Sequence, residues 1–169
     1  MMASDYLRKL LEHNNWANLR VIDACANLND DQLDAEPSAS TKGSIRVTLW
    51  HLMAAQQRYV WRVTGQEPAF NWQAPPSFAE LKEAALVSGE QLLTIAKDDP
   101  QAMLETQFEG TNYLVEAWVV MVQTIYHAGE HREQIKSMLT ALGVTPPEID
   151  GWLFGESTGA LREANASKQ

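Results

Sequence analysis

The sequence predicts an all-α protein, a four-helix bundle with long crossover loops. Four segments of roughly 20 to 29 residues carry apolar side chains at intervals of three and four, the spacing of one helix face. Two long polar or proline-containing connections separate these segments, as crossover loops do in bundles. The chain has 169 residues, 45% of them hydrophobic and 21% charged, a composition typical of one folded domain.

The first predicted helix runs from about Ser4, which would serve as its N-cap, to Leu28. The polar stretch 29–43 ends it. The second helix is predicted from Ser44 to Thr64, with Gly65 ending it. One stripe of the first helix collects Leu7, Leu11, Asn14, Asn18, Val21 and Cys25.

A proline-containing loop with two aromatic residues, Phe70 and Trp72, follows over 66–76. It would either cover the end of the bundle as a lid or form an ordinary packed connection. Ser77 and Glu80 form the capping-box pattern that begins a third helix. That helix is predicted to reach Lys97.

Residues 98–113 show no clear periodicity, and 104–108 are expected to form a short extended piece. The fourth helix is predicted from about Leu114 to Leu142, because Gly143 and two prolines follow it. One more short helix is expected within 148–160. We assign 1–162 to a single domain and 163–169 to a flexible C-terminal tail.

Charge and cysteine content exclude several classes of protein. There are 13 Lys and Arg against 22 Asp and Glu, a net charge of −9, which argues against binding nucleic acid or an anionic membrane. The single cysteine, Cys25, cannot form an internal disulfide. No signal-peptide pattern is found, and the longest apolar stretch, 114–126, is too short to span a bilayer. We expect a cytoplasmic protein with a small-molecule substrate.

Two histidines of the fourth helix form the clearest candidate site. His127 and His131 are four residues apart, so they lie on one face and suit a shared metal ion. They lie at the edge of the apolar stripe, which also contains Arg132, a residue that needs a partner or a route to solvent. Gln134 lies one turn beyond His131 and could hydrogen-bond a metal ligand or a substrate. The alternative for the pair is packing against aromatic side chains.

A third imidazole is available on the second helix. His51 lies among small or apolar neighbours, where an imidazole requires a hydrogen-bond partner or a metal. Three imidazoles with an open position for water would be the arrangement of a catalytic metal. Periodicity permits this convergence without showing it, and a hydrogen-bonded core histidine is the alternative for His51. His13 is expected on the surface.

Several segments together resemble the DinB family, and the resemblance covers nearly the whole chain. These segments are Asn15-Trp16-Ala17-Asn18, Thr48-Leu49-Trp50-His51-Leu52, His127-Ala128-Gly129-Glu130-His131-Arg132-Glu133-Gln134, Leu142-Gly143, Pro146-Pro147 and Asp150-Gly151-Trp152. The resemblance implies a DinB and YfiT-like bundle with up-down-down-up connectivity. It also implies a divalent metal, commonly nickel or zinc, held by His51, His127 and His131.

Relatives in that family include thiol transferases that use bacillithiol, mycothiol or glutathione, and a maleylpyruvate isomerase. A low-molecular-weight thiol is therefore implied as a possible cosubstrate. Relatives often have an acidic residue shortly after the histidine of the second helix, where this chain has Gln56 and Gln57. A role that depends on a carboxylate at this place is not expected here.

Three further residues are candidates for substrate binding. Arg58 lies on the His51 stripe together with Arg62 and would bind a carboxylate, or else extend to solvent and pair with surface acids. Asn18 would contact a metal-bound water or a ligand histidine, or else form a polar cross-link between helices. Gln134 is the third candidate. No nucleophile is predicted, because Cys25 lies on an apolar stripe.

We therefore predict a metal-dependent enzyme that activates a thiol or water, of the thiol-transferase or hydrolase type. A non-catalytic metal-binding or sensing bundle is the alternative, and a bundle whose histidines stay empty is a third. The first half of the fourth helix is apolar beyond its inward stripe, through Trp118, Val122 and Ile125. A helix that is apolar on most sides must be covered on most sides, so we predict a homodimer.

Overall fold

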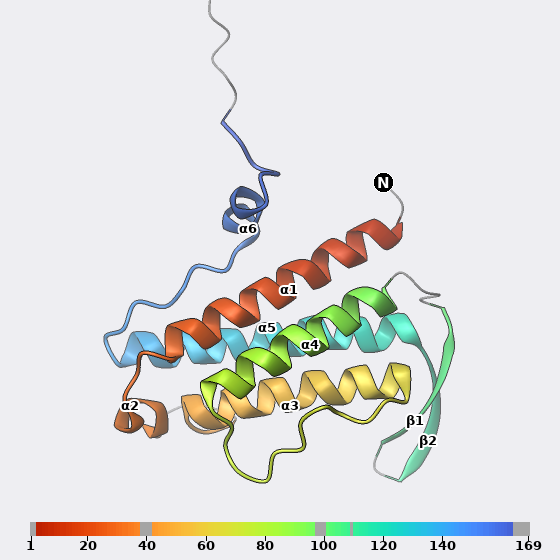
Figure 1. Ribbon diagram of the computed structural model, residues 1–169, viewed down its shortest axis with the longest axis horizontal. Coiled ribbons are helices and arrows are strands. Elements are labelled where there is room, and N and C mark those ends of the chain that lie inside the picture. The colour runs from red at the N-terminus through yellow and green to blue at the C-terminus, as the bar shows by residue number, and fades with distance from the viewer. Residues whose placement is uncertain (1–2, 38–41, 97–100, 109, 164–169) are drawn as a thin grey trace, which may run out of the picture.

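The structure, a computed structural model, is mostly helical and describes residues 3–37, 42–96, 101–108 and 110–163. Figure 1 shows the long helices lying side by side, with a two-stranded hairpin at one end of the molecule. The elements are α1 (Ala3–Cys25), α2 (Asp30–Asp34), α3 (Ile45–Thr64), α4 (Phe78–Ile95), β1 (Met103–Phe108), β2 (Thr111–Glu116), α5 (Ala117–Ala141) and α6 (Gly151–Ser157).

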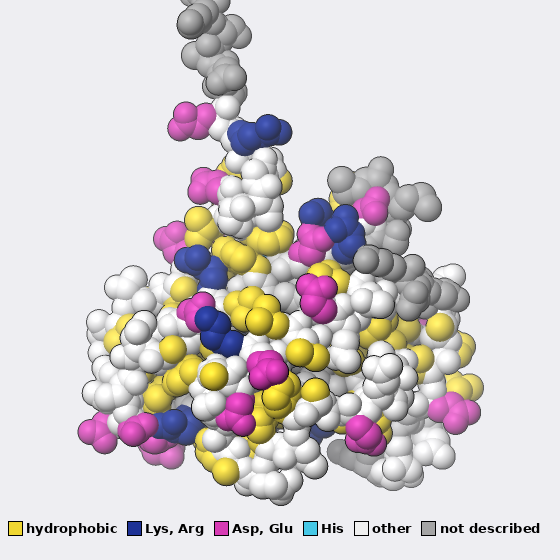
Figure 2. All heavy atoms as spheres, viewed as in Figure 1, with side chains coloured by type: hydrophobic (Ala, Val, Ile, Leu, Met, Phe, Trp, Pro, Cys, Tyr) yellow, Lys and Arg dark blue, Asp and Glu magenta, His cyan; other side chains and the backbone are white. Residues whose placement is uncertain are grey.

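The long helices pack so that α1 and α3 each contact both α4 and α5. Their apolar faces form two clusters of buried side chains. The larger cluster includes Ile22, Leu52 and Ile135, and the smaller cluster includes Leu92 and Met121. Burial of these faces is the main favourable contribution to folding. On the face shown in Figure 2, acidic side chains are scattered among apolar ones.

The signals at the ends of α3 and α4 are confirmed. The Ser44 hydroxyl accepts a hydrogen bond from the Val47 amide, and Gly65 ends α3 with a left-handed φ of 67°. Ser77 and Glu80 form the predicted capping box. The segment that contains His51 is therefore a well-bounded helix.

The beginning of the fourth helix was predicted wrongly. β2 pairs antiparallel with β1, so that Met103 lies opposite Glu116, and α5 begins only at Ala117. Residues 104–108 are extended as predicted. The all-α prediction is therefore incomplete by one hairpin. In this hairpin Met103, Tyr113 and Leu114 are exposed by 50% to 68%, so the part of the apolar run before Ala117 does not mark a buried helix face.

Smaller differences concern the ends of the other helices. Ser4 lies inside α1 instead of capping it, and α1 ends at Cys25, three residues before Leu28. The stretch 29–43, predicted as a connection, contains the short helix α2, which a capping box of Asn29 and Gln32 begins. The third helix ends at Ile95, and Lys97 lies outside the described residues.

The predicted short C-terminal helix is present as α6, and the Asp150 carboxylate caps it by accepting from the Leu153 amide. Of the predicted tail, residues 164–169 lie outside the described part of the chain. The assignment of a single domain over 1–162 stays a prediction. Among the described residues, no helix combines the length and apolar character needed to cross a membrane.

Candidate metal centre

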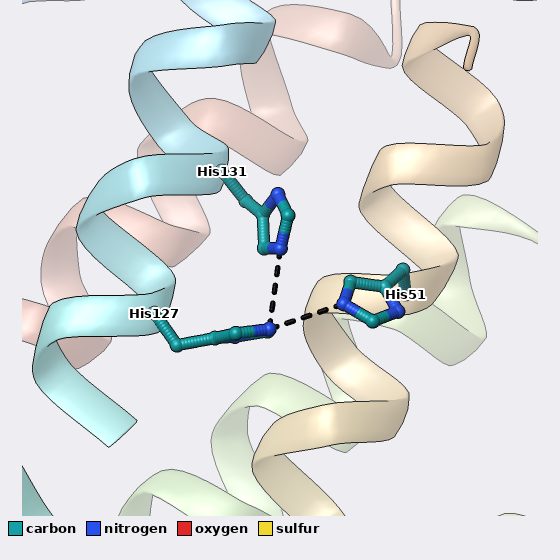
Figure 3. A group of neighbouring side chains, drawn as sticks. All are labelled: His51, His127 and His131. Carbon is teal, nitrogen blue, oxygen red and sulfur yellow. Dashed lines mark hydrogen bonds between the residues drawn. The ribbon is translucent and has the colours of Figure 1, made fainter. Parts of the chain in front are cut away.

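The structure brings His51, His127 and His131 together between two helices. His51 comes from α3 and the other two from α5, which pack against each other (Figure 3). The Nε2 atom of His127 lies 3.0 Å from Nε2 of His51 and 3.2 Å from Nε2 of His131. One ligand atom from each residue lies within 4.8 Å of the other two.

This geometry fits a single metal ion. Nitrogen ligands at about 2.0–2.1 Å from a tetrahedral zinc ion are about 3.3–3.4 Å apart. The observed separations from His127 are within a few tenths of an ångström of that value. The ligand atoms of His51 and His131 lie within 4.8 Å of each other, so the rings of these two residues would have to bring their nitrogens to about the same spacing around a shared ion.

The protonation of the imidazoles also fits metal binding. Burial lowers the pKa of both His51 and His127 to about 4, and the positive charge of Lys42 acts in the same direction. Both rings are therefore neutral at pH 7 and present lone pairs.

Gln134 hydrogen-bonds a proposed metal ligand, one of the two roles predicted for it. Its Oε1 lies 2.8 Å from Nδ1 of His131 and accepts the ring N–H. This bond selects the tautomer in which Nε2 of His131 carries the lone pair, and Nε2 is the atom that faces the other histidines. Ligand histidines in metal sites are usually held by such a partner.

A pocket of about 250 Å³ opens beside the histidines. Its lining consists of His51, Ala55, Arg58, Tyr59, Arg62 and His127. The ring of Tyr59 contacts that of His127 edge-to-face, with centroids 5.6 Å apart. The structure therefore places Arg58, a predicted substrate-binding residue, in the wall of the same pocket as two of the histidines.

Asn18 does not line this pocket. It is completely buried, its Oδ1 accepts from Arg132 Nη1 at 2.7 Å, and its Nδ2 donates to Gln56 Oε1 at 2.9 Å. Of the two roles predicted for Asn18, the structure gives it the polar cross-link between helices.

Arg132 has hydrogen-bond partners inside the protein, as its place on the apolar stripe required. Its Nη1 also donates to Asn14 Oδ1 at 2.7 Å, so two amide oxygens accept hydrogen bonds from the buried guanidinium. Among the described residues it forms no ion pair, and burial lowers its pKa to about 10. Gln56 extends the cluster by donating to the Ser88 hydroxyl of α4 at 2.8 Å.

The sequence analysis missed the role of Gln56. The available signal was a polar residue on the buried face of α3, but the partners of Gln56 lie on two other helices, α1 and α4. His13 was expected on the surface and is instead partly buried: its Nε2 lies 2.7 Å from the Ile149 carbonyl, and its ring contacts Phe154. The Cys25 thiol is buried, which raises its pKa to about 12 and agrees with the prediction that it is no nucleophile.

Comparison with solved structures supports the fold. The chain is similar to the crystal structure of a DinB-like protein from Bacillus cereus, with 18% sequence identity and a TM-score of 0.59. The match covers 81% of this chain and 91% of that one. A search of curated proteins finds no match. The sequence model of the DinB family matches residues 1–166, so the chain belongs to the DinB family.

Proposed function

We propose that His51, His127 and His131 bind one divalent metal ion, nickel or zinc, and that the site is catalytic. The observation that carries this proposal is the convergence of three imidazoles from two helices, with the Nε2 atoms of His51 and His131 at 3.0 and 3.2 Å from that of His127. Three protein ligands leave a position open for a reactant, as in catalytic sites.

When bound, such a metal lowers the pKa of a thiol or water at its remaining position. The protein residues position the ligands and the reactant. Gln134 fixes the ring of His131, and the packing of α3 on α5 sets the distance from His51 to His127. The pocket of about 250 Å³ gives a small molecule access to the histidines.

We favour thiol activation, with a low-molecular-weight thiol as cosubstrate, and hydrolysis as the second reaction. Among the described residues, the lining of the pocket includes no carboxylate that would serve as a general base for water, whereas a thiol at a metal needs no strong base. The non-catalytic metal-binding bundle is the alternative from another class, and a pocket that binds no small molecule would favour it.

The proposal includes the connectivity that the DinB family implies, and the location and homodimer that the sequence predicts. The four long helices would form an up-down-down-up bundle, and the protein would act as a cytoplasmic homodimer. Trp118 and Val122 of α5 are 45% and 50% exposed and provide an apolar surface that a second subunit would cover.

Metal analysis of purified variants tests the proposal, and the fourth histidine offers a control. We expect the wild-type chain and His13→Gln to retain nickel or zinc at a single equivalent per chain after dialysis. His127→Ala should lose it, because the loss of one of three ligands removes most of the affinity. Equal metal content in all three proteins, or no metal in any of them, would contradict the proposal.

Thiol binding is then tested with bacterial low-molecular-weight thiols. A thiol that binds the metal raises the melting temperature of the metal-loaded protein and leaves that of the metal-free protein unchanged. A thiol-dependent shift that persists after metal removal would argue against metal-assisted thiol activation.

A further inference from the structure

A second, larger hollow adjoins the histidine pocket. It is a groove of about 490 Å³ between α3 and the loop 66–76, which runs back along α3 in Figure 1. We call it the aromatic groove because its apolar lining includes Trp50, Trp61, Phe70 and Trp72. Arg58 lines both the groove and the histidine pocket, so the two hollows meet at this residue.

The flat surfaces in the groove favour a flat ligand. The rings of Phe70 and Trp72 are stacked, with centroids 5.6 Å apart and planes 24° apart. Trp61, on α3, is 39% exposed although it is a large apolar side chain. Aromatic faces bury large apolar areas and pair well with other rings in offset or edge-to-face arrangements.

The groove also carries hydrogen-bond donors without acceptors. Gln57 is 5% exposed, and its Oε1 accepts from the Phe70 amide at 3.1 Å. This bond fixes the orientation of the side-chain amide, because only the oxygen can accept. The Nε2 of Gln57 and the indole Nε1 of Trp72 are both buried and have no partner among the described residues. Both atoms are covered by protein, so a ligand in the groove would contact the aromatic faces and Arg58 and not these two donors.

The charge at the junction of the two hollows is positive. Arg58 is exposed and forms no ion pair with any described residue. Lys42 and Arg58 both act on His51 as positive charges, in a chain whose net charge is −9. Glu67 is the acidic residue of the groove lining and is exposed to solvent, which screens its charge.

We propose that the aromatic groove binds a flat aromatic molecule that carries a carboxylate, with its ring against the tryptophans and its carboxylate on Arg58. A guanidinium binds a carboxylate through two parallel hydrogen bonds, which selects an acid over its neutral amide. As the substrate class of the histidine site, this inference rests on the proposed function. As a binding site, it does not require the metal.

The test uses 3-phenylpropionate as the probe, with 3-phenylpropanamide and propionate as matched compounds that lack the charge and the ring. Binding to the full chain is measured by calorimetry and by tryptophan fluorescence, before and after zinc removal. We expect the acid to bind with a dissociation constant on the order of 1 mM or tighter, a range typical of a ligand of this size. The amide and propionate should each bind about tenfold or more weakly, because each loses one of the two contacts.

Two variants separate the groove from general charge effects. Arg58→Gln should weaken binding of the acid about tenfold or more and leave binding of the amide unchanged. Arg162→Gln makes the same change of charge at an exposed site outside the groove and should change nothing. Trp61→Ala, which removes one exposed aromatic face of the groove, should weaken binding of the acid several-fold.

The outcomes separate this inference from the proposed function. Binding of the acid that depends on Arg58 supports the groove even if the chain holds no zinc. No saturable binding, equal binding of acid and amide, or equal effects of the two arginine variants would overturn it, even if zinc binds to the three histidines.

Discussion

A single glutamine decides which nitrogen of His131 is available to a metal. The 2.8 Å contact between Gln134 Oε1 and His131 Nδ1 holds the ring with Nε2 toward the other two histidines. Without it, the ring could rotate or change tautomer, and both changes would reduce its value as a ligand. In the proposed site, Gln134 would therefore position a ligand without touching the ion.

We predict that Gln134→Leu lowers the affinity for zinc about 10-fold to 100-fold, the range typical of lost hydrogen-bond partners of ligand histidines. Glu133→Ala is the control, because its carboxylate pairs with Lys136 on the exposed face of the same helix. Competition titration with a chelating dye measures both affinities. An unchanged affinity in Gln134→Leu would show that the hydrogen bond does not hold the ligand.

The histidines also predict how the metal-free protein responds to acid. The pKa of His51 and of His127 falls from 6.5 to about 4 on folding, so between these values the unfolded chain binds more protons than the folded one. Their contribution to stability is complete above about pH 6.5 and is lost as the pH falls toward 4.

Thermal unfolding of the metal-free protein from pH 7 to pH 4 measures this effect. We expect the melting temperature to fall less steeply over this range in His127→Gln than in the wild type, because one titrating group is gone. Parallel profiles would mean that the imidazole of His127 titrates normally in the folded protein.

At the scale of elements, the polar cluster of Arg132, Asn14, Asn18, Gln56 and Ser88 joins all four long helices through their buried faces. A buried guanidinium with only amide acceptors depends on each of them, since an unpaired buried charge is costly. Because Arg132 follows His131 directly, the cluster also fixes the rotation of α5 that turns the histidines toward α3.

We predict that Asn18→Ala lowers the free energy of unfolding by about 2 kcal/mol, since Arg132 loses one of its two acceptors and Gln56 loses a donor. Asn71→Ala, in the exposed loop 66–76, should change it by less than about 0.5 kcal/mol. Urea denaturation gives both values. Equal stability of the two variants would mean that the cluster contributes nothing to holding the helices together.

The sequence was sufficient to predict the elements whose ends carry strong local signals. It was insufficient where the structure depends on contacts between elements. The bounds of α3 follow from Ser44 and Gly65, and the 127/131 spacing placed two histidines on one face of α5. The hairpin could not be told from the start of α5, because Leu114 belongs to an apolar run that either structure would accommodate. The partners of Asn18 and Arg132 depend on how four helices pack together. The periodicity along a single helix carries no information about this packing.

At the scale of the whole molecule, exposed apolar side chains gather on one face of α5. Trp118, Val122 and Tyr126 of α5 and Leu114 of the hairpin are each exposed by 45% to 68%. Exposed apolar side chains gathered on one helix face are characteristic of interaction surfaces. This surface agrees with the predicted homodimer, which stays a prediction.

We predict that sedimentation at micromolar concentration shows a dimer and that Val122→Asp shifts it to a monomer, because a charge would be buried at the interface. Leu86→Asp is the control, since Leu86 is equally exposed on α4, by 53%, and should leave the dimer intact. A wild-type monomer, or dissociation caused by Leu86→Asp alone, would place the interface elsewhere or exclude it.

The proposed function requires that histidines from two helices share one ion. Anomalous diffraction from crystals of the zinc-loaded or nickel-loaded protein, recorded at the absorption edge of the metal, tests it directly. We expect one peak at about 2.0–2.1 Å from Nε2 of His51, His127 and His131. A peak bound by only the two histidines of α5, or no peak between α3 and α5, would contradict it.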